Sequence, residues 1–192
     1  YAVGDGMIKQ EKDYIRRQKK KYGIYTLIWT IVVLGFYGIG MIITGERANI
    51  FTIIAGFLVI GLALSLSRLC VYFKFKDGNA AYSELLETMK GSLSIFHSCI
   101  IPDTRTTSFV EHIVVTSRSI YFLVYDEEVL RKNRLWLENR LKAKGIELKQ
   151  IHFIRLDHEN SVKNAMVKIE KDACYTSEKL EEYTQLIQEL IM

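Results

Sequence analysis

Two long apolar stretches separated by five residues decide the fold of this chain. Residues 24–44 read IYTLIWTIVVLGFYGIGMIIT, and residues 50–73 read IFTIIAGFLVIGLALSLSRLCVYF. The first stretch has no charge over its 21 residues, and the second contains one charge, Arg68. A helix of about 20 residues is about 30 Å long, which matches the hydrocarbon core of a bilayer. The pattern therefore predicts a transmembrane helical hairpin over residues 24–73.

Two other interpretations of these stretches fit less well. A signal peptide has a shorter apolar core and is not normally followed directly by a second apolar segment. A buried hairpin inside a soluble protein would need a larger chain than these 192 residues to cover it. We therefore expect a multi-pass protein of the cell membrane.

Basic residues flank the predicted hairpin at both of its ends in the chain. Residues 7–22 contain seven Lys or Arg and two acidic residues, a net charge of +5, whereas residues 45–49 contain one Arg and one Glu. Positive residues near a span stay on the cytoplasmic side, so both termini are expected in the cytoplasm. The residues expected to lie at the lipid surface are Arg16, Arg17, Lys19, Lys20, Lys21, Arg68, Lys74 and Lys76.

This charge pattern makes residues 1–23 a basic juxtamembrane segment with membrane lipids as its expected partner. Binding of nucleic acid by the same basic run is the less favoured interpretation. Met7 fits a native initiator, so nothing is inferred from residues 1–6.

Small residues recur along both predicted spans and allow close helix packing. They include Gly35 and Gly38 on the first span, and Gly61 and Ser65 on the second. Packing inside the hairpin and packing between protomers both explain them. Arg68, near the cytoplasmic end, either extends its side chain to the headgroups or forms an ion pair. Neither span contains an acidic residue, which argues against an autonomous transporter or channel.

Residues 77–192 change in character and predict a cytoplasmic α/β domain. Apolar periodicity predicts a helix over 78–90, three strands over 94–101, 109–116 and 119–125, and a second helix over 127–144. Further strands are predicted over 149–156 and 165–170, followed by a last helix. The order α-β-β-β-α-β-β-α describes a mixed sheet with helices on its faces, and it matches the core of the restriction-endonuclease-like fold.

Several residues in this domain resemble the nuclease-related domain family, a branch of the PD-(D/E)xK nucleases. Gly78, Glu84 and Met89 are similar to its opening helix, and residues 110–115, VEHIVV, are similar to its second strand. Residues 119–126, SIYFLVYD, are similar to its third strand. The resemblance covers residues 78–190 and implies a Mg²⁺-dependent nuclease fold.

The resemblance does not extend to the residues that bind metal and activate water in the family. Family members hold Mg²⁺ with carboxylates on strands two and three, and a lysine two residues after the second acid helps to activate water. Here the acid position is Val124 and the lysine position is Asp126, while Glu111 keeps a carboxylate. The pair Pro102–Asp103 lies one element too early to replace the missing motif.

The charge of the domain and the spacing of its Cys and His residues also argue against a metal-dependent nuclease. Residues 77–192 contain 15 Lys or Arg and 18 Asp or Glu, a net charge of −3, which does not suit a polyanion. Cys70, Cys99 and Cys174 are widely spaced, and the four histidines show no zinc-binding pattern. On an ideal strand, Glu111 and His112 face opposite sides, so they would not share a site.

The sequence therefore predicts a membrane-anchored, non-catalytic interaction or scaffold protein that self-associates or joins another membrane protein. It has no expected cofactor, and nucleic acid is not an expected partner. The alternative is a membrane-tethered nuclease with a rearranged site, using Glu84, Glu111 and Asp126 and, as metal ligands, Glu111 and Asp126 for Mg²⁺. A subunit role in a larger membrane assembly is not separable from the first hypothesis by sequence.

Overall fold

The chain divides into two compact units, which we describe separately. In the computed structural model, one unit is Ile15–Lys76, called the hairpin here, and the other joins Tyr1–Tyr14 to Asp77–Met192, called the sheet domain. The structure describes residues 7–46, 49–102, 107–125, 127–157 and 159–191.

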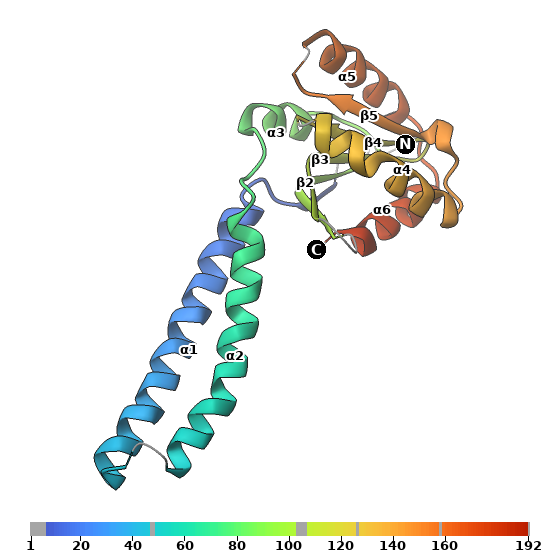
Figure 1. Ribbon diagram of the computed structural model, residues 1–192. Helices are drawn as coiled ribbons and strands as arrows, with labels where there is room; N and C mark the ends of the chain where they lie inside the picture. Colours follow the sequence, from blue (N-terminus) through green and yellow to red (C-terminus); the bar gives the residue numbers. More distant parts are fainter. Residues whose placement is uncertain (1–6, 47–48, 103–106, 126, 158, 192) are drawn as a thin grey trace. The chain divides into compact units, whose positions relative to one another are not determined.

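The hairpin consists of two antiparallel helices, α1 (Tyr14–Thr44) and α2 (Ile50–Phe73), which run side by side (Figure 1). Gly45 ends α1 with a φ of 67°, a conformation that glycine adopts without a Cβ clash. Asn49 caps α2, since its side-chain Oδ1 accepts the Thr52 N–H at 3.0 Å. Both helices are long and apolar enough to cross a membrane.

The sheet domain is built on five strands in the order β1-β2-β3-β4-β5. Strands β2 (Leu93–Pro102), β3 (Thr107–Thr116) and β4 (Ile120–Val124) form an antiparallel meander. Helix α4 (Glu127–Ala143) then crosses to β5 (Ile151–Arg155), which pairs parallel with β4 after a short 3₁₀ turn. The mixed sheet expected from the sequence is therefore present.

Two apolar clusters, one on each face of the sheet, make up the core. One cluster joins the sheet to α4 and α6 (Lys179–Leu190) through residues such as Leu141 and Ile187. The other joins it to α3 (Ala80–Glu87) and α5 (Glu159–Ala173) through Leu86 and Ile169. Helices thus cover both faces of the sheet, as Figure 1 shows for this unit.

Residues 165–170 were expected to form a strand, and this prediction was wrong. They lie inside α5, whose buried side chains recur at helical spacing. Val162, Met166, Ile169 and Ala173 belong to the second apolar cluster, and Ala165 is buried as well. The full stripe runs at i, i+3, i+4, i+7 and i+11, which is one face of a helix and not an alternating strand.

The first strand of the sheet was not expected from the sequence. Residues Met7–Gln10, which the charge pattern grouped with the basic juxtamembrane segment, form β1 and pair parallel with β2. The segment before the hairpin is therefore part of the sheet domain. This arrangement brings the two chain segments that lead into and out of the hairpin to the same strand, β2.

Candidate functional site

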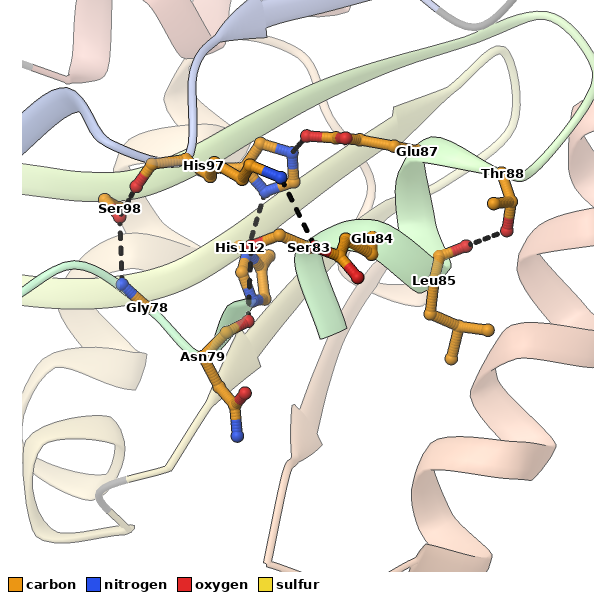
Figure 2. A network of polar contacts seen from close by, with 11 residues as sticks. Gly78, Asn79, Ser83, Glu84, Leu85, Glu87, Thr88, His97, Ser98 and His112 are labelled. Atoms are coloured by element: carbon orange, nitrogen blue, oxygen red, sulfur yellow. Dashed lines mark hydrogen bonds and ion pairs between the residues drawn. The ribbon is translucent and has the colours of Figure 1, made fainter. Parts of the chain in front are cut away.

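A pair of buried histidines marks the polar centre of the sheet domain. His97 on β2 and His112 on β3 lie directly opposite each other in the strand register, and both are completely buried. Their Nδ1 atoms are 2.9 Å apart, and the rings meet edge to face with an interplanar angle of 84°. Figure 2 shows the two rings beside α3, with Ser83 and Glu87 near them.

Burial keeps both imidazoles neutral. The pKa of His97 is lowered to about 4, mainly by burial and also by the positive charge of Lys12. The pKa of His112 is lowered to about 3, again by burial and then by His97. Two neutral imidazoles at this distance share one proton between their facing nitrogens, so each ring uses its Nδ1 in the pair.

The surroundings of the two outer nitrogens favour one direction for the hydrogen bond between the rings. His97 Nε2 lies 3.5 Å from a carboxylate oxygen of Glu87, so the favourable tautomer of His97 carries its proton on Nε2. His112 then donates its Nδ1–H to His97, and its own Nε2 keeps a lone pair. Among the described residues, neither buried Nε2 atom has a hydrogen-bond partner, and only that of His97 has a carboxylate nearby.

Ser98, next to His97 on β2, forms hydrogen bonds with the segment before α1 and with the segment after α2. Its hydroxyl accepts the Gly78 N–H at 3.0 Å and donates to the Lys12 carbonyl at 3.3 Å. The side chain of Gln10 donates to the Ser98 carbonyl at 3.3 Å. Ser98 has a φ of 55°, the left-handed region, which is unusual for a serine inside a strand. We call His97, Ser98, His112, Lys12 and Gly78 the junction network.

The junction network connects both covalent entries to the hairpin. Lys12 lies two residues before α1 begins, and Gly78 lies five residues after α2 ends. Gly78 packs so tightly that an added Cβ would lie 3.2 Å from His112 Cε1 and 3.4 Å from Glu111 Cβ. A buried polar group on β2 thus holds the segment before α1 and the segment after α2 in one place.

Glu111 and His112 do not separate onto two faces as an ideal strand would place them. Both approach Gly78, and Val110 and Ile113, three positions apart, belong to the same apolar cluster. The strand alternation is therefore interrupted opposite Ser98. The expectation that Glu111 and His112 face opposite sides assumed a regular strand, and the interrupted alternation brings both close to Gly78 instead.

Glu111 has a structural contact. Its side chain is almost completely buried, and Oε2 accepts the Tyr125 N–H at 3.1 Å, just beyond the end of β4. Val124, where the resemblance implies an acid, is a core residue packed under α4 and α6. Asp126, the third carboxylate of the nuclease alternative, lies outside the described residues.

Glu84 is on the exposed side of α3. Its carboxylate forms an ion pair with Lys12 at 3.5 Å, and its side chain is 68% exposed. Within the part of the chain that the structure describes, no group of three or more His, Cys, Asp or Glu side chains is arranged to hold a metal ion. The structure therefore does not place Glu84 and Glu111 in a ligand set.

The residues expected at a lipid surface gather at one end of the hairpin, and we call them the basic cluster. Helix α1 carries five of them in its first turns, and α2 carries Arg68 near its last turn. Lys74 caps α2 and Lys76 follows it. The basic cluster consists of Arg16, Arg17, Lys19, Lys20, Lys21, Arg68, Lys74 and Lys76.

The four small residues expected in helix packing fall into two pairs. Ser65 is buried and lies 3.2 Å from the Thr26 hydroxyl across the hairpin, while a Cβ on Gly61 would lie 2.9 Å from the Trp29 ring. Gly35 and Gly38 differ, since a Cβ on either would meet nothing within 4 Å. Packing inside the hairpin thus accounts for Gly61 and Ser65, and it does not account for Gly35 and Gly38.

Comparison with protein-family models, with curated proteins and with solved structures finds no match for this chain. The structure has a sheet domain with helices on both faces, whose buried polar network contacts the chain segments before α1 and after α2.

Proposed function

We propose that this protein is a membrane-anchored, non-catalytic interaction module that self-associates through its hairpin. Helices α1 and α2 span the membrane, and the sheet domain with both termini lies in the cytoplasm. The sheet domain acts as a platform for another copy or for another subunit of a membrane complex.

The anchor is supported by length, exposure and charge. At 31 and 24 residues, α1 and α2 reach about 46 and 36 Å, more than a hydrocarbon core of about 30 Å. Large apolar side chains such as Leu34, Ile42 and Phe57 stay exposed along them, which suits lipid and not water. The basic cluster lies at the end that the positive-inside rule assigns to the cytoplasm.

The non-catalytic assignment rests on one observation: the polar residues of the sheet domain form structural hydrogen bonds. Glu111 accepts a backbone N–H, and Ser98 joins the chain segments on either side of the hairpin. Val124 fills the core at the position where a second metal-binding acid is implied. These residues therefore have structural roles within the sheet domain.

Self-association is supported by the open glycines of α1. Gly35 and Gly38 lie one turn apart on one helix face, and nothing in the hairpin covers them. A second α1 could approach closely there, because small residues allow backbone contact between helices in lipid. The expected assembly is a dimer or a higher oligomer through α1.

A tethered nuclease is the second candidate. It is supported by the sequence resemblance, by the order α3-β2-β3-β4-α4-β5, and by Glu111, which keeps a carboxylate on β3. This function requires a rearranged site of Glu84, Glu111 and Asp126, in which Glu111 and Asp126 bind Mg²⁺. The core position of Val124 is the observation against it.

Sizing of the full chain in lipid nanodiscs tests self-association. The wild type is expected as a dimer or larger, and the double variant Gly35→Leu, Gly38→Leu is expected to be monomeric. Gly56→Leu is the matched control, since Gly56 is also uncovered but has Ile53 and Ile60 one turn away. A wild-type monomer that purifies without a partner contradicts the proposal.

Metal binding separates the two candidates. Calorimetry of the full chain with Mg²⁺ and Mn²⁺, and cleavage assays on single- and double-stranded DNA and RNA, are expected to show neither binding nor cleavage. Metal binding or cleavage that disappears in Glu111→Gln would establish the nuclease instead.

A further inference from the structure

A groove between α1 and α2, inside the hairpin, has no role in the function proposed above. Its volume is about 310 Å³. Helix α1 lines it with Lys21, Tyr25 and Trp29, and α2 lines it with Leu64 and Arg68. The lining positions recur every three or four residues on each helix, so the groove runs along the two facing helix surfaces.

One end of the groove is cationic and lacks a counter-charge. The Arg68 guanidinium donates to the Tyr22 hydroxyl at 3.4 Å and lies 5.7 Å from the centre of the Tyr22 ring. Lys21 stands over the other side of the same groove, 5.9 Å from that ring. Among the described residues, neither cation forms an ion pair with a carboxylate.

The nearest carboxylate within the hairpin is far from these cations. Glu46 is the one acidic residue in Ile15–Lys76, and it follows the opposite end of α1. At 1.5 Å per residue, α2 alone places Arg68 roughly 25 Å from that end. An anion that binds at Lys21 and Arg68 must therefore come from outside the hairpin.

The rest of the groove is apolar and aromatic. Trp29 forms part of its wall, and it packs there because Gly61 has no side chain: a Cβ would lie 2.9 Å from the indole ring. Tyr25 and Leu64 continue the surface. Tyrosine and tryptophan favour the depth at which lipid headgroups meet acyl chains.

We infer that this groove binds an anionic phospholipid, with its phosphate at Lys21 and Arg68 and the start of an acyl chain along Trp29 and Leu64. The inference rests on the proposed membrane anchor. The occupant is a lipid and not a free anion, because the cations open directly onto the apolar surface of a predicted span. The surrounding basic cluster concentrates anionic lipid at the same end of the hairpin.

Native mass spectrometry of the full chain, released from nanodiscs that contain equal amounts of phosphatidylglycerol and phosphatidylcholine, tests the inference. The wild type is expected to retain phosphatidylglycerol about ten-fold more than phosphatidylcholine, because charge-assisted hydrogen bonds favour the anionic headgroup. Arg68→Gln should remove most of this preference, and Arg68→Lys should keep part of it. Lys21→Gln provides a second variant in case Arg68→Gln does not fold.

Lys20→Gln is the matched control, since it removes the same charge one residue away and outside the groove. It should change the preference by less than about two-fold, as expected for an exposed charge. An equal loss in Lys20→Gln and Arg68→Gln would mean diffuse attraction and would overturn the site. Displacement of the lipid by glycerol 1-phosphate alone would show a phosphate site without an acyl-chain contact, which also overturns it.

Recovery of the chain in the nanodiscs is measured in the same experiment. A chain that does not enter the discs contradicts the proposed anchor, and the lipid site falls with it. A chain that enters the discs and shows no lipid preference contradicts the lipid site alone.

Discussion

Ser98 is the residue with the most unusual backbone in the described sheet. Its left-handed φ of 55° costs a β-carbon-bearing residue about 1–2 kcal/mol, and its hydroxyl compensates by joining Lys12 and Gly78. The strain and the bonding occur at the same residue. A conformation of this kind persists where the surrounding structure needs it.

Replacement of Ser98 should reverse the usual preference of strands for alanine over glycine. Ser98→Ala keeps the strain and loses both hydroxyl bonds, so it should destabilise the sheet domain by about 2 kcal/mol. Ser98→Gly loses the same bonds but relieves the strain, so it should cost about 1 kcal/mol less. Hydrogen exchange of β2 amides in the full chain measures both. A glycine variant that is less protected than the alanine variant would contradict the account.

The histidine pair should make the sheet domain sensitive to acid. An unfolded histidine has a pKa near 6.5, whereas His97 and His112 have pKa values of about 4 and about 3 when folded. Between these values the unfolded chain binds more protons, so stability is complete above pH 6.5 and falls as the pH decreases. Each histidine contributes a slope of up to about 1.4 kcal/mol per pH unit.

His112→Gln should remove about half of this histidine-dependent slope, measured by chemical denaturation of the full chain between pH 7 and 5. The control is His152→Gln, because His152 is only partly buried and its pKa is lowered less strongly by its surroundings. Imidazole NMR signals of His97 and His112 that titrate near pH 6.5 would show that the pair is not buried and neutral.

The sequence predicted the strands that carry Glu111 and Val124, but it did not predict the contact between the two histidines. Glu111 and Val124 were placed correctly on neighbouring strands, because their strands have clear apolar patterns. The histidine pair was missed, since the contact depends on the register that puts residue 97 opposite residue 112. No short-range spacing signals such a pair, and zinc-like spacing was the wrong criterion.

At the scale of elements, the helices and strands with long sequence patterns were predicted correctly, and those with short patterns were not. The long apolar runs of α1 and α2 and the β2–β3–β4 meander were recovered because each pattern repeats over many residues. Residues 165–170 were assigned to a strand because the window was too short to show the helical stripe from Val162 to Ala173. Strand β1 was missed because its four residues look like part of a basic segment.

Two glycines of α2 should respond oppositely to alanine. Gly61→Ala would place a Cβ 2.9 Å from the Trp29 ring, so it should destabilise the hairpin by about 1–3 kcal/mol. Gly56→Ala meets nothing within 4 Å and should be neutral or stabilising, since alanine favours helix. Thermal unfolding in micelles, followed by Trp29 fluorescence in a Trp136→Phe background, compares them. Equal behaviour of the two variants would contradict the packing.

For the whole molecule, the proposed topology predicts which sites a membrane-impermeant maleimide can reach. Cys174 is exposed in the sheet domain and Cys99 is buried, so Cys70→Ser leaves one accessible native thiol. Glu46→Cys in this background should be labelled in intact cells, because the proposed topology puts residues 45–49 outside. Cys174 should be labelled only after permeabilisation. Labelling of Cys174 in intact cells would reverse the orientation.

The central claim is that the molecule assembles in the membrane through the open glycine face of α1. Disulfide cross-linking in native membranes tests it most directly, with Gly38→Cys and Gly56→Cys each placed in the Cys70→Ser background. The account predicts a band of twice the monomer mass for Gly38→Cys and only monomer for Gly56→Cys. Monomer alone for Gly38→Cys, or equal cross-linking at both positions, would contradict it.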